Sequence, residues 1–522
     1  MKKILPAIAA LLFILSGCTK LNEDVYTNIS SDNFYKTAAD LNTALTGVYK
    51  VFQTPFCNDY QYWMKIEVAS ETGAPTNTKD NPSLYNNWSY ANNPDNTVSK
   101  WADGYNVINQ ANSLIAHSAG VSMDSTAKNA IIAQARFLRS LTLFYLVRLY
   151  GGVPIPDGYT SSLNNLNIPR KTVDEDYTYI IADLQFAANN LPKKSAIAAG
   201  SKYQASKGAA LALLSKVYLY RASMTDDATL KQTYFQNSEA NSALVVNSGE
   251  YALEADFKNL WMWWNTNNKE GKESIFEVEF GYSASGNANQ LHIYGGINYT
   301  DANLGCYQFT RWGVSFSTYN SFASNDLRRD ASFMTVFTDS KAKTINWYAS
   351  NLGKYVVTPG NWPTSTPGDL KYYDRSAQSY SSSSAASDIY IIRYAEVLLN
   401  YAEAENEVNG PTALAYQYIN MVRNRAGLAN LTAGLSKQQF SDALYQERTW
   451  EFVGEGQLFY DALRTDRLGD LVKAEVSDGV AKGYNLYSAL AFTPKKTFLW
   501  KIPTYDLNSN PALVQNPDNV SK

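Results

Sequence analysis

Residues 125–154 read STAKNAIIAQARFLRSLTLFYLVRLYGGVP, and this stretch decides the fold class of the 522-residue chain. One face recurs every three or four residues, which is the period of an α-helix. That face consists of Ala130, Gln134, Leu138, Leu141, Tyr145 and Arg148. Gly151-Gly152-Val153-Pro154 ends the pattern, because glycine favours the turn after a helix and proline cannot continue one. The sequence therefore predicts a long helix, a rod of about 36 Å at 1.5 Å per residue.

Further helices are predicted on both sides of this one. Thr172 and Glu175 have the spacing of a capping box, so a helix is expected to begin there and to end at Leu191-Pro192. Helical periods predict others at 39–51, from residue 101, at 204–223 and 229–247, from Asp388 to Gly410, between Thr412 and Gly427, and after a capping box of Ser436 and Gln439. Paired helices in series are typical of tetratricopeptide-like scaffolds.

Two long segments interrupt the helices. Residues 53–100 are rich in Asn, Pro, Ser and Thr, residues 281–387 are rich in Gly, Asn, Ser and Tyr, and neither segment has a sustained period. Glu273 to Phe280, by contrast, alternates like a half-buried strand. The predicted fold class is mainly α: a tetratricopeptide-like scaffold of helical hairpins with an irregular insertion of loops and short strands. No strict 34-residue consensus is visible, so a non-repeating helical domain remains the alternative. Long loops in a compact protein usually carry function.

Composition excludes several classes of function. The chain has 45 Lys plus Arg against 48 Asp plus Glu, a net charge of −3, and so no basic field for a nucleic acid. Two histidines and three cysteines leave little for a zinc site or a Ser-His-Asp enzyme. No EF-hand spacing is found, so we expect no metal and no cofactor, although a calcium ion among loop carboxylates stays open. Chemistry built from carboxylates also stays open.

The amino terminus is predicted to be a lipoprotein export signal. Lys2 and Lys3 precede an apolar run that is too short to span a bilayer, so residues 1–17 are expected to be a signal peptide. Leu15-Ser16-Gly17-Cys18 resembles the bacterial lipobox and predicts lipidation of Cys18, with residues 18–32 as a tether. An ordinary secretory signal is the alternative. The sequence leaves open whether Cys57 and Cys306 form a disulfide.

Several strings, in order along the chain, resemble the SusD/RagB family. They are Ala135 to Arg139, Tyr145 to Pro154, Tyr390 to Ala404, Ile419-Asn420 with Val422 to Ala426, Glu447 to Phe452 with Gly454-Glu455-Gly456, Leu499 to Pro503, and Gln515-Asn516-Pro517. The resemblance implies a lipid-anchored protein on the outer-membrane surface of the Bacteroidetes type. Such a protein captures oligosaccharides, or in some branches peptides, for a TonB-dependent transporter of the SusC type, and does not hydrolyse them. Glu23 and Asp24 after Cys18 look like a surface-export signal of this group.

The resemblance also suggests how the body is divided. Residues 33–522 are expected to form a SusD-like body, with a helical scaffold at 33–250 and 388–475. A loop-rich ligand-binding insertion is expected at 251–387, followed by a carboxyl-terminal segment at 476–522. Ligand contacts in the family lie on excursions from the scaffold, so we looked for site residues in the two irregular segments.

Candidate ligand-binding residues are aromatic rings and amides, since rings pack on the C–H face of a sugar and amides bind its hydroxyl groups. Trp88 and Trp312 are the first candidates because polar residues or glycine surround them, and both indoles are expected to be exposed. The other candidates are Asn81, Tyr85, Asn86, Tyr282, Tyr294 and Tyr299. Trp101, Trp450 and Trp500 are predicted to be structural, and the run from Trp261 to Trp264 is interpreted as core rather than site.

Three carboxylates suggest an alternative function. Glu447, Glu451 and Glu455 share one helix face, and paired carboxylates are the catalytic groups of glycosidases. We favour ion pairs instead, with Arg448 and Arg464 as candidate partners. The leading hypothesis is therefore a glycan-capture lipoprotein, with a peptide or other nutrient binder as the first alternative and a carboxylate-based glycosidase as the second.

Overall fold

The computed structural model describes residues 34–57, 62, 64–75, 87–94, 98–162, 166–262, 269–281, 289, 291–295, 312–339, 341–346, 366–374, 385–481 and 489–519. The helix predicted first is confirmed as α6 (Ser125–Tyr150). The Asp124 side chain caps it by accepting a hydrogen bond from the Ala127 amide, and Gly151 follows it with a φ of 74°. α6 is long and apolar enough to cross a membrane, but 78% of that window is buried inside the protein, so it is a core helix.

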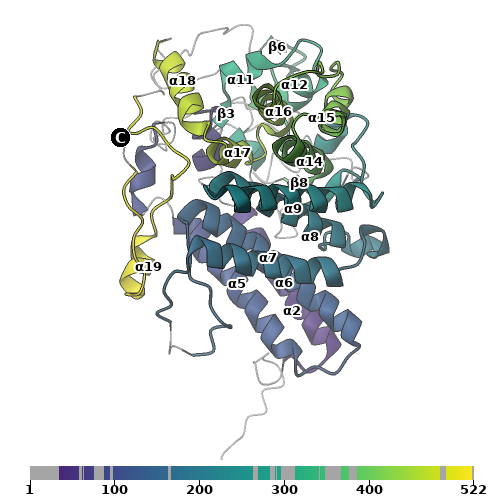
Figure 1. The fold of residues 1–522 in the computed structure, drawn as a ribbon, viewed down its shortest axis with the longest axis vertical. Helices are drawn as coiled ribbons and strands as arrows, with labels where there is room; N and C mark the ends of the chain where they lie inside the picture. Colours follow the sequence, from purple (N-terminus) through teal and green to yellow (C-terminus); the bar gives the residue numbers. More distant parts are fainter. Residues whose placement is uncertain are drawn as a thin grey trace, which may run out of the picture.

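The scaffold is a series of helices in which each packs on the next (Figure 1). Its first half runs α2 (Ala38–Cys57), α5 (Val98–Ser118), α6, α7 (Val173–Asn190), α8 (Lys207–Met224) and α9 (Ala228–Val246). Its second half runs α14 (Tyr394–Asn409), α15 (Ala413–Arg425), α16 (Lys437–Phe452), α17 (Leu458–Arg464) and α18 (Leu468–Ala481). α9 packs directly on α14, so the series continues across the insertion. The predicted mainly α fold is confirmed.

Local sequence sets the ends of these helices. Thr172 and Glu175 form the predicted capping box of α7, and Ser436 and Gln439 form that of α16. Each box satisfies two backbone amides that the first helical turn leaves without a partner. Gly410, with a φ of 84°, follows α14 and allows the chain to turn away where other residues would be strained. The boundaries thus follow from residue chemistry rather than from packing.

The insertion consists of short elements. They are η6 (Phe257–Trp261), β2 (Ser274–Val278), α10 (Leu291–Gly295), β3 (Trp312–Val314), α11 (Phe316–Ser321), α12 (Leu327–Ser332), β4 (Phe333–Met334), β5 (Val336–Thr338), β6 (Thr344–Asn346) and β7 (Gly368–Asp369). The described strands form antiparallel pairs: β1 (Gly73–Pro75) with β3, β2 with β8 (Ile389–Arg393), β4 with β7, and β5 with β6. The β1–β3 pair joins the two irregular segments to each other.

Two predictions about the edges of the insertion were wrong. The helix expected from Asp388 begins at Tyr394, because Ile389 to Ile392 is a β-branched and aromatic run that pairs with β2 as strand β8. The strand at 274–278 exists, but it is not half-buried. Glu277 is 5% exposed, because its side chain is enclosed and accepts a hydrogen bond from the Glu270 amide.

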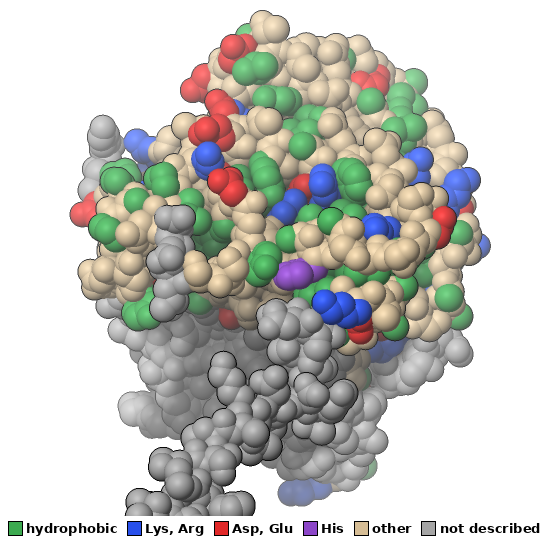
Figure 2. All heavy atoms as spheres, turned by 90° about the horizontal axis from the view of Figure 1, so that it is seen from below, with side chains coloured by type: hydrophobic (Ala, Val, Ile, Leu, Met, Phe, Trp, Pro, Cys, Tyr) green, Lys and Arg blue, Asp and Glu red, His purple; other side chains and the backbone are tan. Residues whose placement is uncertain are grey.

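The carboxyl-terminal segment closes the body. The Trp500 amide donates to the Leu149 carbonyl at 2.7 Å, and the Asn516 side chain donates to the Tyr150 carbonyl at 2.9 Å, both at the end of α6. Trp500 and Trp101 are buried, as predicted. The short helix α19 (Thr504–Ser509) lies beyond Trp500. On the face seen in Figure 2, described Lys and Arg side chains are interspersed with Asp and Glu side chains, which agrees with the small net charge.

Candidate functional site

Trp88 is a core residue, and the prediction that it is exposed was wrong. Its side chain is 0% exposed and lies stacked on Phe459, with ring centroids 5.8 Å apart. Phe498 meets the indole edge-on at 4.8 Å. Trp88 has a φ of 69° and precedes the short helix η2 (Ser89–Asn92). The polar residues around it in sequence therefore do not place it on the surface.

Trp312 is also enclosed, at 4% exposed, so the expected open indole is not observed there either. It lies on β3, whose pairing with β1 and contact with α10 cover the ring. Tyr294 stacks on it at 6.2 Å and remains partly exposed. The structure thus brings parts of both irregular segments together at this point. Five other candidates and the lipidation site lie outside the described residues: Asn81, Tyr85, Asn86, Tyr282, Tyr299 and Cys18.

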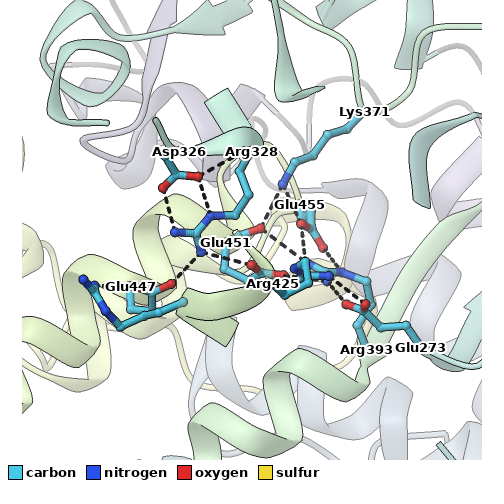
Figure 3. A network of polar contacts seen from close by, with 10 residues as sticks. Glu273, Asp326, Arg328, Lys371, Arg393, Arg425, Glu447, Glu451 and Glu455 are labelled. Carbon is cyan, nitrogen blue, oxygen red and sulfur yellow. Dashed lines mark hydrogen bonds and ion pairs between the residues drawn. The ribbon is translucent and has the colours of Figure 1, made fainter. Parts of the chain in front are cut away.

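The centre of a buried ion network is formed by Glu447 and Glu451 of α16 together with Glu455, which lies beyond the end of the helix (Figure 3). The expectation that all three glutamates share one helix face was therefore wrong. Arg328 Nη1 lies 2.6 Å from Glu447 Oε1 and 3.1 Å from Glu451 Oε2. Arg425 Nη2 lies 2.6 Å from Glu451 Oε1, which Arg393 also binds at 2.9 Å. Lys371 Nζ and Arg393 Nη2 bind Glu455 Oε1 at 2.7 and 2.8 Å. Arg423 also pairs with Glu447, and Glu273 pairs with Arg425.

The electrostatics of the network fit a structural role. Burial alone would raise the pKa of Glu451, but the charges of Arg425, Arg393 and Arg328 outweigh burial and hold that pKa below its usual range. Burial raises the pKa of Glu447 despite Arg328 and Arg423. Glu447 and Glu451 are 0% exposed. Removing either partner of such a pair leaves a buried charge without compensation, so the network fixes the elements that supply it.

The predicted ion-pair role of Glu447, Glu451 and Glu455 is confirmed, but Arg448 and Arg464 are not their partners. Arg448 pairs with Asp461 at 2.8 Å, and Arg464 pairs with Asp461 and Glu403. The cations at the three glutamates are instead Arg328 of α12, Lys371, Arg393 of β8, and Arg423 and Arg425 of α15. A glycosidase carboxylate must face a sugar in a cleft, whereas Glu447 and Glu451 face guanidinium groups.

A cavity of about 640 Å³ lies in the insertion, next to this network. Its apolar wall includes the rings of Trp261, Tyr319 and Phe337, and its polar wall includes Lys258, Arg329 and Asp330. The remaining lining residues are Met262, Ala331, Phe333, Met334, Thr335, Val336, Thr338, Leu370 and Tyr373. The volume of the cavity falls within the range of about 300–1,000 Å³ that is typical of small-ligand sites. Polar atoms make up more of its exposed lining than apolar atoms do.

The ion network and the cavity share walls. Arg328 precedes Arg329 and Asp330, and Lys371 follows Leu370, so the network holds two segments that line the cavity. Trp261 lies between them, with Lys371 Nζ 4.7 Å from its ring centroid. Trp261 is buried, as the core interpretation predicted, yet it also lines the cavity. Sequence analysis missed Lys258, Tyr319, Arg329 and Asp330, because no motif distinguishes them from other loop residues.

Metal binding finds no support in the part of the chain that the structure describes. No group of three or more His, Cys, Asp or Glu side chains is arranged there to hold a metal ion.

Comparison with known proteins gives consistent matches along the chain. The profile described as "SusD family" matches residues 272–518, and the profile described as "Starch-binding associating with outer membrane" matches residues 21–219. The SusD-like protein P2 of Formosa agariphila is 28% identical, covering 99% of both chains. A SusD homolog of Bacteroides thetaiotaomicron has a similar structure, with a TM-score of 0.77, 24% identity, and coverage of 95% of this chain and 100% of that one. Surface glycan-binding protein A of Bacteroides fluxus is also similar in structure, with a TM-score of 0.73 and 21% identity, and the match covers 93% of this chain and 100% of that one.

Proposed function

Because the chain belongs to the SusD/RagB family, we propose that it is a lipid-anchored outer-membrane protein of the cell surface that binds oligosaccharides and delivers them to a TonB-dependent transporter of the SusC type. The family profile that covers its first half is described as starch-binding and associated with the outer membrane. One similar structure is a surface glycan-binding protein. These descriptions belong to relatives, and they support the proposal for this chain.

The observation that carries the proposal is the cavity in the insertion. The ring of Tyr319 offers a flat apolar surface, and the polar residues of the cavity offer donors and acceptors for hydroxyl groups, which together match the two faces of a sugar. The volume of about 640 Å³ is in the range of a small oligosaccharide site. Tyr319 is the most useful residue for a test, because it lines the cavity and is partly exposed, whereas Trp261 and Phe337 are buried.

Binding is tested with the soluble chain from residue 19 onward in polysaccharide-containing gels. Retention on at least one glycan, weakened about tenfold in Tyr319→Ala but not in Tyr505→Ala, is the expected result. Tyr505 is 78% exposed and is not among the cavity residues, so it is a matched control. Retention of no glycan, together with binding of a peptide library, would favour the nutrient-binder alternative.

A second assay separates binding from catalysis. The same glycans, incubated with the protein, are expected to give no shorter products by chromatography. Product release that disappears in Glu451→Gln would overturn the binding interpretation and would show that α16 carries catalytic carboxylates.

A further inference from the structure

The polar wall of the cavity carries more positive than negative charge. Lys258 and Arg329 provide the cations, and Asp330 provides the carboxylate. Asp330 already pairs with Arg329, whose Nε lies 2.9 Å from Asp330 Oδ1. The Lys258 ammonium has no ion-pair partner among the described residues. The nearby Asp256 carboxylate accepts the Lys258 amide as the N-cap of η6. The wall therefore holds one cation in excess.

Among the described residues, the cations of the neighbouring ion network, unlike Lys258, are all paired with carboxylates. There Arg328 and Lys371 are buried, and each binds carboxylates at close distance. Lys258 is exposed and lines a hollow that is walled in part by the apolar rings of Trp261, Tyr319 and Phe337. Such walls focus the field of a charge and raise the local concentration of the opposite charge. The Lys258 ammonium is therefore expected to attract an anion more strongly than a lysine on an open surface does.

The aromatic wall limits what kind of anion fits. Tyr319 is partly exposed, and its ring lies edge-on to Phe333, with centroids 5.8 Å apart. Arg329 lies 5.8 Å from the centroid of the same ring. A small inorganic anion would leave this apolar surface uncovered. A sugar that bears an anionic group covers the ring with its C–H face and meets the cation with its charge.

We propose that this cavity selects acidic saccharides, whose carboxylate or sulfate group pairs with Lys258 while the sugar ring packs on Tyr319. The inference rests on the proposed function, because it names the class of glycan that the same cavity binds. Uronic acids and sulfate esters both present oxygen anions that accept charge-assisted hydrogen bonds from an ammonium group. The experiment distinguishes these two sources of charge.

The test compares matched charged and neutral glycans. The soluble chain is titrated with polygalacturonate and its methyl ester, and with dextran sulfate and dextran. We expect the charged member of at least one pair to bind about tenfold more tightly at low salt, and this preference to shrink at 0.15 M salt, where the Debye length is about 8 Å. Preference for polygalacturonate identifies the carboxylate, and preference for dextran sulfate identifies the sulfate.

Variants locate the preference in the cavity. Lys258→Met is expected to remove the tenfold preference, and Lys258→Arg is expected to keep it. Lys343→Met changes the net charge equally, but Lys343 is exposed in the same insertion outside the cavity, so it is expected to have no effect. A preference that survives Lys258→Met, or the absence of any preference for charge, would overturn this inference. Tight binding of the neutral members alone would overturn it while leaving glycan capture intact.

Discussion

At the scale of the residue, polar neighbours in the sequence do not predict that a side chain is exposed. Trp88 lies between Asn87 and Ser89, yet its ring is enclosed by Phe459, Phe492 and Phe498. Its backbone is in the left-handed conformation, and its polar neighbours Asn87 and Ser89 are only partly exposed. Tyr319, by contrast, lines the cavity of the insertion and is partly exposed, although it has no distinctive sequence motif.

Trp88→Ala is therefore expected to destabilise the fold rather than to affect binding alone. Removing a buried indole typically costs about 3–5 kcal/mol through lost contacts and the cavity left behind. A thermal melt should show a large fall in melting temperature, and Trp88→Phe should show a smaller one. A Trp88→Ala protein that melts like the wild type but no longer binds glycan would restore Trp88 as a site residue.

At the scale of the element, α16 holds the insertion to the scaffold. Its Glu447 and Glu451 bind Arg328 of α12, and Glu451 also binds Arg393 of β8 and Arg425 of α15 (Figure 3). Glu455, just after the helix, binds Lys371, which follows β7. The strings containing Glu447 and Glu455 thus supply ion pairs that hold Arg328 and Lys371. Because Arg328 precedes Arg329 and Lys371 follows Leu370, these ion pairs anchor two segments that line the cavity.

Arg328→Met is expected to loosen that wall. The change leaves Asp326 and Glu447 with less compensation, and breaking a buried pair typically costs about 3–5 kcal/mol. Hydrogen exchange should accelerate at 327–338 more than in α6. Lys437→Met is the control, because Lys437 pairs with Glu407 at the surface, where such pairs contribute about 0–1 kcal/mol. Equal exchange at 327–338 in both variants would show that the network does not hold the wall.

At the scale of the whole molecule, buried carboxyl groups make stability depend on pH. Burial raises the pKa of Glu67 to about 8 and those of Glu71 and Asp369 to about 7. The folded protein therefore retains protons that the unfolded chain releases above about pH 4.5. Each of these groups stabilises the fold below that pH and loses its contribution as the pH rises toward 7–8. The lowered pKa of Glu451 acts in the opposite direction, below about pH 4.5.

The melting temperature is accordingly expected to be highest near pH 5 and to fall between pH 5 and pH 8. Differential scanning calorimetry in buffers of constant ionic strength measures this profile. Glu67→Gln keeps the shape of the side chain and removes its titration, so it should make the fall shallower. A melting temperature that rises steadily to pH 8 would contradict this assignment of protonated carboxyl groups.

The predicted attachment of the protein to the membrane through Cys18 also concerns the whole molecule. If Cys18 carries acyl chains, each buried CH₂ contributes about 0.8 kcal/mol to membrane binding. Cys18→Ala is expected to move the protein from the membrane fraction to the soluble fraction, and protease treatment of intact cells should digest the wild type. Membrane retention of the Cys18→Ala protein would contradict the lipid anchor.

The sequence alone determined most of the long scaffold helices, because caps, glycine stops and helical periods act over a few residues. Thr172, Ser436 and Gly410 fix helix ends through their own backbone and side-chain chemistry. The family resemblance was also readable from local strings. The strand at 389–393 escaped prediction because it exists only by pairing with β2, more than a hundred residues earlier.

Only the tertiary structure decided which rings are buried, which cations meet the α16 glutamates, and where a cavity opens. Exposure depends on what packs against a side chain, and those partners come from segments far apart in the chain: Phe459 for Trp88, Arg328 for Glu447, and Lys258 with Tyr319 at the cavity. Such contacts leave no period and no spacing in the sequence, because they arise only when the insertion folds back on the helices.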